Sequence, residues 1–124
     1  MPLQSFIWVA CGGALGAVAR FGISGLLKAP AGFPWATLGI NLFGSFLMGL
    51  LVGWLSKQSG SHEGLGLFIG VGVLGGFTTF SAFSMEVFQL LEKRELLAMS
   101  GYLGGSLVGG IIMFGAGYLL LKGL

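Results

Sequence analysis

Charged side chains are rare in this chain of 124 residues, where Asp, Glu, Lys and Arg together make up only 8%. A soluble domain carries about 25% of such residues, because charges cover the surface that faces water. This scarcity argues strongly against a soluble enzyme. It also excludes a disordered chain, which would be polar, because hydrophobic residues make up 55% here. We therefore expect lipid to surround most of the protein.

Cysteine and surplus positive charge are scarce as well. The single cysteine, Cys11, has no second cysteine to pair with, which excludes an intrachain disulfide framework and a cysteine zinc site. We expect it to be a small buried hydrophobic residue. The net charge of +2 is too small for a nucleic-acid surface, so no nucleic-acid partner is expected. No nucleotide-binding motif or catalytic triad is present, which argues against an enzyme.

Long apolar runs, by contrast, fill the chain. Each run is long enough to cross a hydrocarbon core of roughly 30 Å as a helix. A cleavable signal peptide is the alternative for the first run, because Ala17, Val18 and Ala19 form a possible cleavage site, but Met1–Ser5 lacks the usual basic residues. The sequence predicts an all-α membrane protein, with residues 1–124 forming a single transmembrane domain of four helices. The runs cover about 3–27, 34–55, 65–91 and 96–121.

The basic residues of the predicted loops are distributed almost evenly between the two sides of the membrane. Four spans place Lys57 and Lys122 on one side, and Lys28, Lys93 and Arg94 on the other. The Lys and Arg bias of short loops sets orientation, so a near-tie predicts insertion both ways up. Both orientations in one membrane would permit an antiparallel homodimer with a two-fold axis in the membrane plane. A single orientation with a weak bias is the alternative.

Glycine is abundant, with 25 residues, and in lipid it allows helix backbones to approach closely. Gly101, Gly105 and Gly109 line one face of the last span across two turns. They indicate a contact with another helix or subunit, and packing within the chain is an equally good interpretation. Other pairs at the same spacing are Gly12 and Gly16, Gly49 and Gly53, Gly66 and Gly70, and Gly72 and Gly76.

Polar residues inside apolar spans are costly, so they indicate where function lies. Arg20 lies roughly 10 Å inside the first run and either snorkels to the headgroups or attracts anions at the mouth of a cavity. Asn41 offers two donors, or forms a bond between helices. Glu86 is a helix-end carboxylate, a partner for Arg20 or a proton carrier. Tyr102 and Ser106 lie one turn apart on the last span, where Tyr102 would also serve as an interface anchor.

The third span carries the densest polar signal, in residues 75–84. Two adjacent glycines precede hydroxyl residues that compete for backbone hydrogen bonds and weaken a regular helix. We therefore predict a break near mid-membrane, with released carbonyls that would suit a hard cation. The hydroxyl residues are Thr78, Thr79, Ser81 and Ser84.

Two phenylalanines lie among these hydroxyls. Phe80 and Phe83 are three residues apart and share one helical face, where core packing is the usual explanation. The positive edge of an aromatic ring can also meet an anion. Ring edges, hydroxyls and the Asn41 amide together form a weakly binding track without a full charge, as conduction requires.

Residues 12–21, 37–46 and 75–84 resemble the signatures of the Fluc, or CrcB, fluoride channels. The resemblance implies passive export of cytoplasmic fluoride by an antiparallel, dual-topology homodimer in the inner or plasma membrane. It also implies two fluoride pores along the dimer interface, lined by both subunits. A central structural sodium ion, Na+, would be held by the main-chain carbonyls of Gly75 and Thr78 from each subunit.

The resemblance also assigns residues to the pore and its mouth. Arg20 would lie at the vestibule, and Glu86 and Tyr102 would be pore or ion-pair residues. Ala36, Ala82 and Gly110 depart from the family pattern, and Ala82 removes a hydroxyl from the polar track. The fluoride pore would be lined by Phe80, Phe83, Asn41, Ser81, Ser84, Thr79 and Ser106.

Two other functions compete with the channel. A proton-coupled exporter of the small multidrug type also has four short spans, but it needs an acidic residue in the first span, and residues 3–27 contain none. A non-conducting assembly subunit would use the polar residues only to pack helices.

Overall fold

The computed structural model describes residues 1–27 and 32–123. It confirms helices apolar and long enough to cross a membrane, and these candidate spans are Leu3–Leu26, Trp35–Leu55, Glu63–Glu92 and Leu96–Lys122. Their ends lie within two residues of the predicted runs. The predicted loop at 28–33, with Lys28, falls mostly outside the described residues. The elements are α1 (Leu3–Leu26), α2 (Trp35–Leu55), α3 (Glu63–Leu65), η1 (Gly66–Leu74), α4 (Gly75–Phe77), α5 (Phe80–Glu92) and α6 (Leu96–Lys122).

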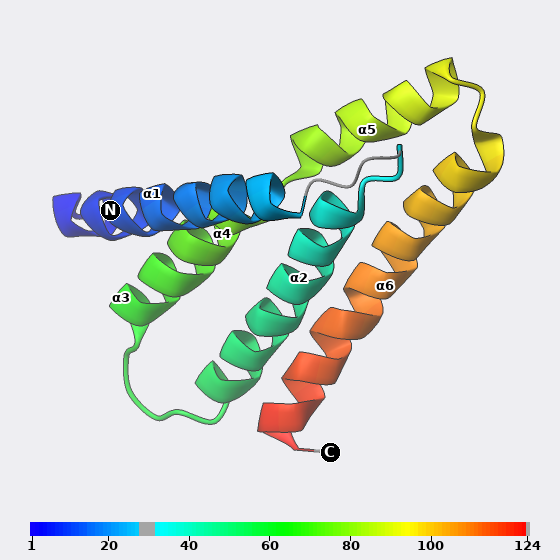
Figure 1. Cartoon of the computed structure of the whole chain (residues 1–124). Helices are drawn as coiled ribbons and strands as arrows, with labels where there is room; N and C mark the ends of the chain where they lie inside the picture. The colour runs from blue at the N-terminus through cyan, green and yellow to red at the C-terminus, as the bar shows by residue number, and fades with distance from the viewer. Residues whose placement is uncertain (28–31, 124) are drawn as a thin grey trace.

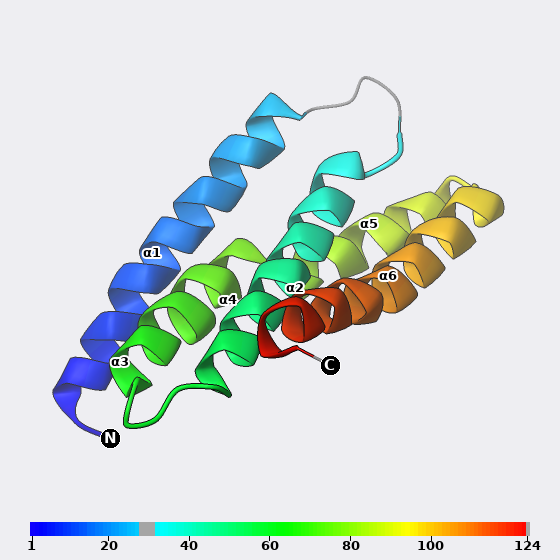
Figure 2. The ribbon, with the colours of Figure 1, turned by 90° about the horizontal axis from the view of Figure 1, so that it is seen from below.

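The helices pack in two pairs. α1 lies against η1 and α4, whereas α2 lies along α6 for most of its length (Figure 1). α5 leaves the direction of α4 and runs beside the first half of α6. Figure 2, turned by 90°, shows the first part of the third candidate span, up to α4, between α1 and α2, whereas α5 lies beside α6. The polar residues of α2, α5 and α6 therefore meet where the third span changes direction.

Glycines make both helix pairs possible. A Cβ atom on Gly12 or Gly16 of α1 would overlap backbone carbonyls of η1, and one on Gly49 of α2 would overlap the Phe114 carbonyl of α6. A Cβ atom on Gly117 would overlap the Phe46 carbonyl. Such close approach compensates for the missing hydrophobic driving force between helices in lipid. The predicted glycine contacts of α1 and α2 are thus present.

The glycine run of α6 behaves differently. No heavy atom of the described residues lies within 4 Å of a Cβ built on Gly101 or Gly105, whereas one on Gly109 would lie 3.0 Å from the Leu42 side chain. Packing within the chain therefore does not explain the first two glycines. They form an exposed strip on the outer face of α6 that no other described helix of the chain covers.

The third span contains a π-helical segment, which is not predicted from the sequence. η1 is a π-helix over Gly66–Leu74, and at its end the Gly75 N–H donates to the Gly70 carbonyl, five residues back. Glycine at positions 66, 70 and 72 tolerates this geometry. Gly72 lets the α1 backbone approach at Gly12, whereas Gly66 and Gly70 lie against side chains of α2. Such π segments often occur at functional sites.

The interior of the single chain is small. Its cluster consists of Phe83, Leu90 and Tyr102, which are at most 6% exposed. Most large apolar side chains point outward, as lipid-facing residues do. Cys11 is exposed as well, so the expectation of burial was wrong. α1 packs only through the face that carries Gly12 and Gly16, and this leaves Cys11 on the outer side.

Candidate anion-binding site at the interrupted third span

The helical backbone of the third span stops at Thr78 and Thr79. α4 ends at Phe77, both threonines are extended with ψ of 155° and 118°, and α5 begins at Phe80. The Thr78 hydroxyl donates to the Leu74 carbonyl at 2.9 Å. The Thr79 hydroxyl accepts the Ala82 N–H at 3.1 Å, which caps α5. The two hydroxyls therefore end one helical segment and start the next.

Asn41 of α2 holds this interruption from the side. Its Oδ1 accepts the Thr79 N–H at 2.8 Å, and its Nδ2 donates to the Thr79 carbonyl at 3.0 Å. One amide thus satisfies both backbone groups of Thr79. The bond between helices, one of the two alternatives for Asn41 in the sequence, is therefore formed. The amide has two N–H donors, so one is not used by Thr79.

Two carbonyls at the interruption lose their helical partners. The Thr79 N–H, which a continuous helix would direct to Gly75, goes to Asn41 instead. The Ala82 N–H, which would return to Thr78, goes to the Thr79 hydroxyl. Gly75 and Thr78 are also the residues to which the family resemblance assigns the sodium ion. Their carbonyl oxygens are therefore available as ligands.

Arg20 also lies at the interruption. Its Nε donates to the Gly76 carbonyl at 3.2 Å, so the side chain is tied to protein at this depth. Glu86 has a different partner, because its Oε1 accepts the Thr37 hydroxyl at 2.7 Å. The predicted alternative of an Arg20–Glu86 pair is therefore not formed in this structure.

The two phenylalanines are neighbours with unequal exposure. The Phe80 and Phe83 ring centroids lie 5.7 Å apart at an interplanar angle of 44°. Phe83 is 6% exposed, and its ring centroid lies 5.1 Å from that of Tyr102. Phe80, by contrast, is 74% exposed. Core packing therefore accounts for Phe83 but not for Phe80.

A cavity of about 320 Å³ collects many of the predicted pore residues from three helices. α2 contributes Asn41 and Ser45, and α6 contributes Ser106. The interruption contributes Thr79, and the start of α5 contributes both phenylalanines. The Ser106 hydroxyl is shielded and has no hydrogen-bond partner among the described residues. The cavity thus combines aromatic rings, hydroxyls and an amide without a formal charge.

Other predicted residues lie beside this cavity rather than on its wall. The Ser84 hydroxyl donates to the Phe80 carbonyl at 2.9 Å, and the Ser81 and Thr79 hydroxyls lie 3.3 Å apart. Tyr102 is fully buried, and its hydroxyl has no partner among the described residues. Interface anchoring is therefore the wrong interpretation for Tyr102.

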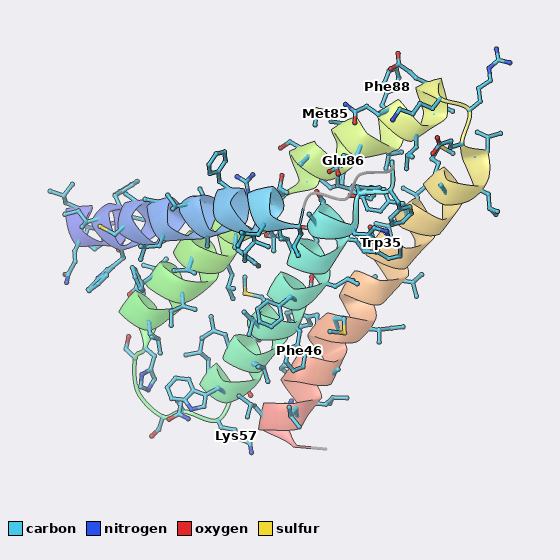
Figure 3. All side chains as sticks on the ribbon, in the orientation of Figure 1. Trp35, Phe46, Lys57, Met85, Glu86 and Phe88 are labelled. Atoms are coloured by element: carbon cyan, nitrogen blue, oxygen red, sulfur yellow. The ribbon has the colours of Figure 1, made fainter. Side chains whose placement is uncertain are left out.

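A second cavity of about 270 Å³ lies between α5 and the start of α2. Its wall includes Thr37, Glu86 and Lys93, and Figure 3 shows Glu86 near Trp35 at this end of the molecule. Thr37 is not among the site residues predicted from the sequence. The sequence does contain an indication of its role, because the Thr37 hydroxyl lies four residues before Asn41 and therefore on the same helical face.

Comparison with known proteins finds similar sequences over nearly the whole chain. Residues 7–118 match the family model of the CrcB-like protein, Camphor Resistance (CrcB). A protein of Novosphingobium aromaticivorans is 47% identical over 94% of this chain and 95% of its own length. One of Sphingopyxis alaskensis is 44% identical over 98% of both chains, and one of Thermus thermophilus is 43% identical over 95% of both. All three relatives are named fluoride-specific ion channel FluC.

The matched region contains all four candidate spans, apart from their outermost ends, and both sides of the interruption. It includes Asn41, the two threonines and the phenylalanine pair. The chain therefore belongs to the CrcB-like protein family.

Proposed function

We propose that this protein is a passive, fluoride-selective ion channel that lets cytoplasmic fluoride leave the cell. The observation that carries the proposal is the cavity at the interruption, in a chain whose full-length relatives are named fluoride-specific ion channels. Its wall offers hydrogen-bond donors and aromatic edges to an anion. Without a fixed positive charge, binding stays weak enough for the ion to leave, as conduction requires.

Acid–base chemistry explains why a passive pore suffices. Hydrogen fluoride crosses lipid as a neutral molecule, ionises inside the cell and is trapped there as the anion. A pore releases the anion without ATP. The cell's inner or plasma membrane, crossed several times by each chain, is the proposed location.

The functional unit in this proposal is an antiparallel homodimer with dual topology. Phe80 is 74% exposed in one chain, although it borders the cavity. Gly101 and Gly105 of α6 are bare within the chain. A second copy would cover these residues and complete two fluoride pores along the interface. The interruption of the third span would then lie near mid-membrane.

The released carbonyls support a structural sodium ion at the centre of the dimer. A hard cation prefers oxygen ligands, and Gly75 and Thr78 each have a carbonyl whose helical amide is used elsewhere. One chain supplies too few ligands for such an ion. Two copies related by a central axis would supply twice as many, and the ion would stabilise the assembly there.

We place the predicted polar residues along each pore. Asn41, Thr79, Ser106 and the phenylalanine pair line the cavity. Ser81 and Ser84 lie beside it, and Arg20 forms the vestibule at the interruption. Glu86 and Tyr102 continue the polar path toward the second cavity, where Thr37 donates to Glu86.

Flux from fluoride-loaded liposomes tests this function against its two rivals. A channel releases fluoride only when a counter-ion can move, for example after valinomycin is added with potassium present. A proton-coupled exporter would continue in a pH gradient without valinomycin. A scaffold would give no flux above empty vesicles. Absence of flux from protein that still assembles would refute the channel.

A further inference from the structure

Arg20 of α1 takes the place of a helical hydrogen bond at the end of α4. In a continuous helix the Gly76 carbonyl would accept the N–H of Phe80, four residues further along. Phe80 instead begins α5, beyond the two extended threonines. The Nε of Arg20 donates to the Gly76 carbonyl at 3.2 Å. A side chain from another helix therefore caps the helical segment that ends at Phe77.

The positive charge of Arg20 also suits this position. The helical segment before the interruption, residues 63–77, ends here with carbonyls that have lost their helical partners, and such an end carries a partial negative charge. The Glu86 carboxylate is directed elsewhere, because its Oε1 accepts the Thr37 hydroxyl. The partner of Arg20 in the described part of the chain is thus a neutral carbonyl at a helix end.

Close packing of α1 on α4 fixes the reach of this hydrogen bond. A Cβ built on Gly76 would lie 2.5 Å from the Gly13 carbonyl oxygen and 3.2 Å from the Ala17 nitrogen. The two backbones therefore touch one turn before Arg20. The hydrogen bond joins two packed helices and does not depend on a loop.

Gly76 lies between the two residues whose carbonyls are proposed to bind sodium. The carbonyls of Gly75 and Thr78 have lost their helical amides. Glycine has the most flexible backbone, so the Gly75–Gly76 pair needs an external hold to keep one conformation. Asn41 of α2 binds the backbone after these residues, and Arg20 of α1 binds it between them.

We infer that Arg20 is a positioning residue for the proposed sodium site, and that it acts through its Nε–H and not through its positive charge. This inference rests on the proposed channel and on the sodium ion proposed with it. The hydrogen bond to Gly76 restricts the backbone that carries the Gly75 and Thr78 carbonyls. Groups that orient metal ligands in this way raise the affinity for the metal.

Three substitutions separate the N–H from the charge. The Nε2 of glutamine and the Nε of arginine both lie one bond beyond Cδ, so Arg20→Gln keeps a donor at the same reach and removes the charge. Arg20→Lys keeps the charge and moves the donor one bond farther out. Arg20→Met roughly keeps the length and removes both. Arg94→Gln is the matched control, because it makes the same change at an exposed residue between α5 and α6.

The thermal unfolding midpoint of the full protein in detergent is measured while Na+ replaces N-methyl-D-glucamine at constant ionic strength. Na+ should raise the midpoint of the unaltered protein, because an ion that binds only the folded assembly stabilises it. Arg20→Gln and Arg94→Gln should reach half of this rise at the same Na+ concentration as the unaltered protein. Arg20→Met should need roughly tenfold more Na+, as the loss of a ligand-orienting partner does. Arg20→Lys should lie between them, because its donor is displaced.

Size-exclusion chromatography must show the same assembly for each variant. If Arg20→Gln loses the Na+ response while Arg20→Lys keeps it in full, the charge is what matters and the inference is refuted. If both respond as the unaltered protein does, Arg20 has no positioning role. This comparison holds even where Arg20→Met does not fold.

The outcomes also separate this inference from the channel function. If Na+ does not stabilise the unaltered protein although it conducts fluoride, the sodium site and the role of Arg20 are refuted and the channel stands. If the unaltered protein gives no fluoride flux, the channel itself is refuted.

Discussion

At the scale of single residues, Asn41 combines two roles that the sequence presented as alternatives. Its amide binds both backbone groups of Thr79, with distances of 2.8 and 3.0 Å, and it also borders the cavity. An apolar residue of the same size would leave the Thr79 N–H and carbonyl without partners, which costs about 1–3 kcal/mol for each buried group. Asn41 therefore holds the shape of the site in addition to any contact with the ion.

Phe80 and Phe83 differ in what their replacement should do. Phe80→Ile and Phe83→Ile should both lower fluoride flux, because isoleucine roughly keeps the volume but lacks the positive ring edge. Phe80 is 74% exposed, so its variant should keep the stability of the single chain. Phe83 is 6% exposed and packs on Tyr102, so its variant should also lose about 1 kcal/mol of stability.

Flux assays and thermal unfolding in detergent check these two variants together. Size-exclusion chromatography must show the same assembly as the unaltered protein. Unchanged flux in both variants would mean that the rings only pack.

At the scale of helices, the third span depends on short-range hydrogen bonds that replace helical ones. Thr78 and Thr79 use their hydroxyls on either side of the interruption, and Asn41 binds the backbone between them. The hydroxyl pattern of 75–84 therefore predicted a weak helix for a sound physical reason. The glycine pair itself stays helical in α4, and the extended residues are the two threonines that follow.

The packing of α1 on η1 gives a prediction at this scale. Gly16→Ala should destabilise the protein by about 1–3 kcal/mol, because the added methyl overlaps the Val73 carbonyl, and backbone cannot move aside as a flexible side chain can. Gly22→Ala is the matched control on the same helix, since no described atom lies within 4 Å of its Cβ. The measurement is the thermal unfolding midpoint in detergent, and equal midpoints for the two variants would contradict the proposed close packing.

At the scale of the whole molecule, one chain leaves its candidate site partly uncovered. Phe80 borders the cavity and is still exposed, and Gly101 and Gly105 have no neighbours within the described chain. Figures 1 and 2 show α5 and α6 at one side of the molecule, away from α1. A second copy on this side is the simplest cover, which is why we propose a dimer.

Added loop charge tests the antiparallel arrangement. Ser59→Lys with Ser61→Lys raises the charge of one side and should fix the orientation, since short-loop Lys and Arg set topology. Fluoride export should then fall, because like-oriented chains cannot form an antiparallel dimer. Co-expression with a Glu92→Lys, Glu95→Lys chain, biased the other way, should restore it. Orientation is measured by labelling an introduced loop cysteine from outside. Full activity from a chain oriented one way only would refute dual topology.

Sequence alone determined the membrane class and the four spans, because composition and run length depend on the solvent and not on packing partners. It also located the weak point of the third span, since hydroxyls compete locally with helical hydrogen bonds. Only the tertiary structure decided that the Asn41 amide binds both backbone groups of Thr79 and that Thr37 donates to Glu86. These contacts join residues distant in sequence, so they depend on how closely glycines let the helices approach.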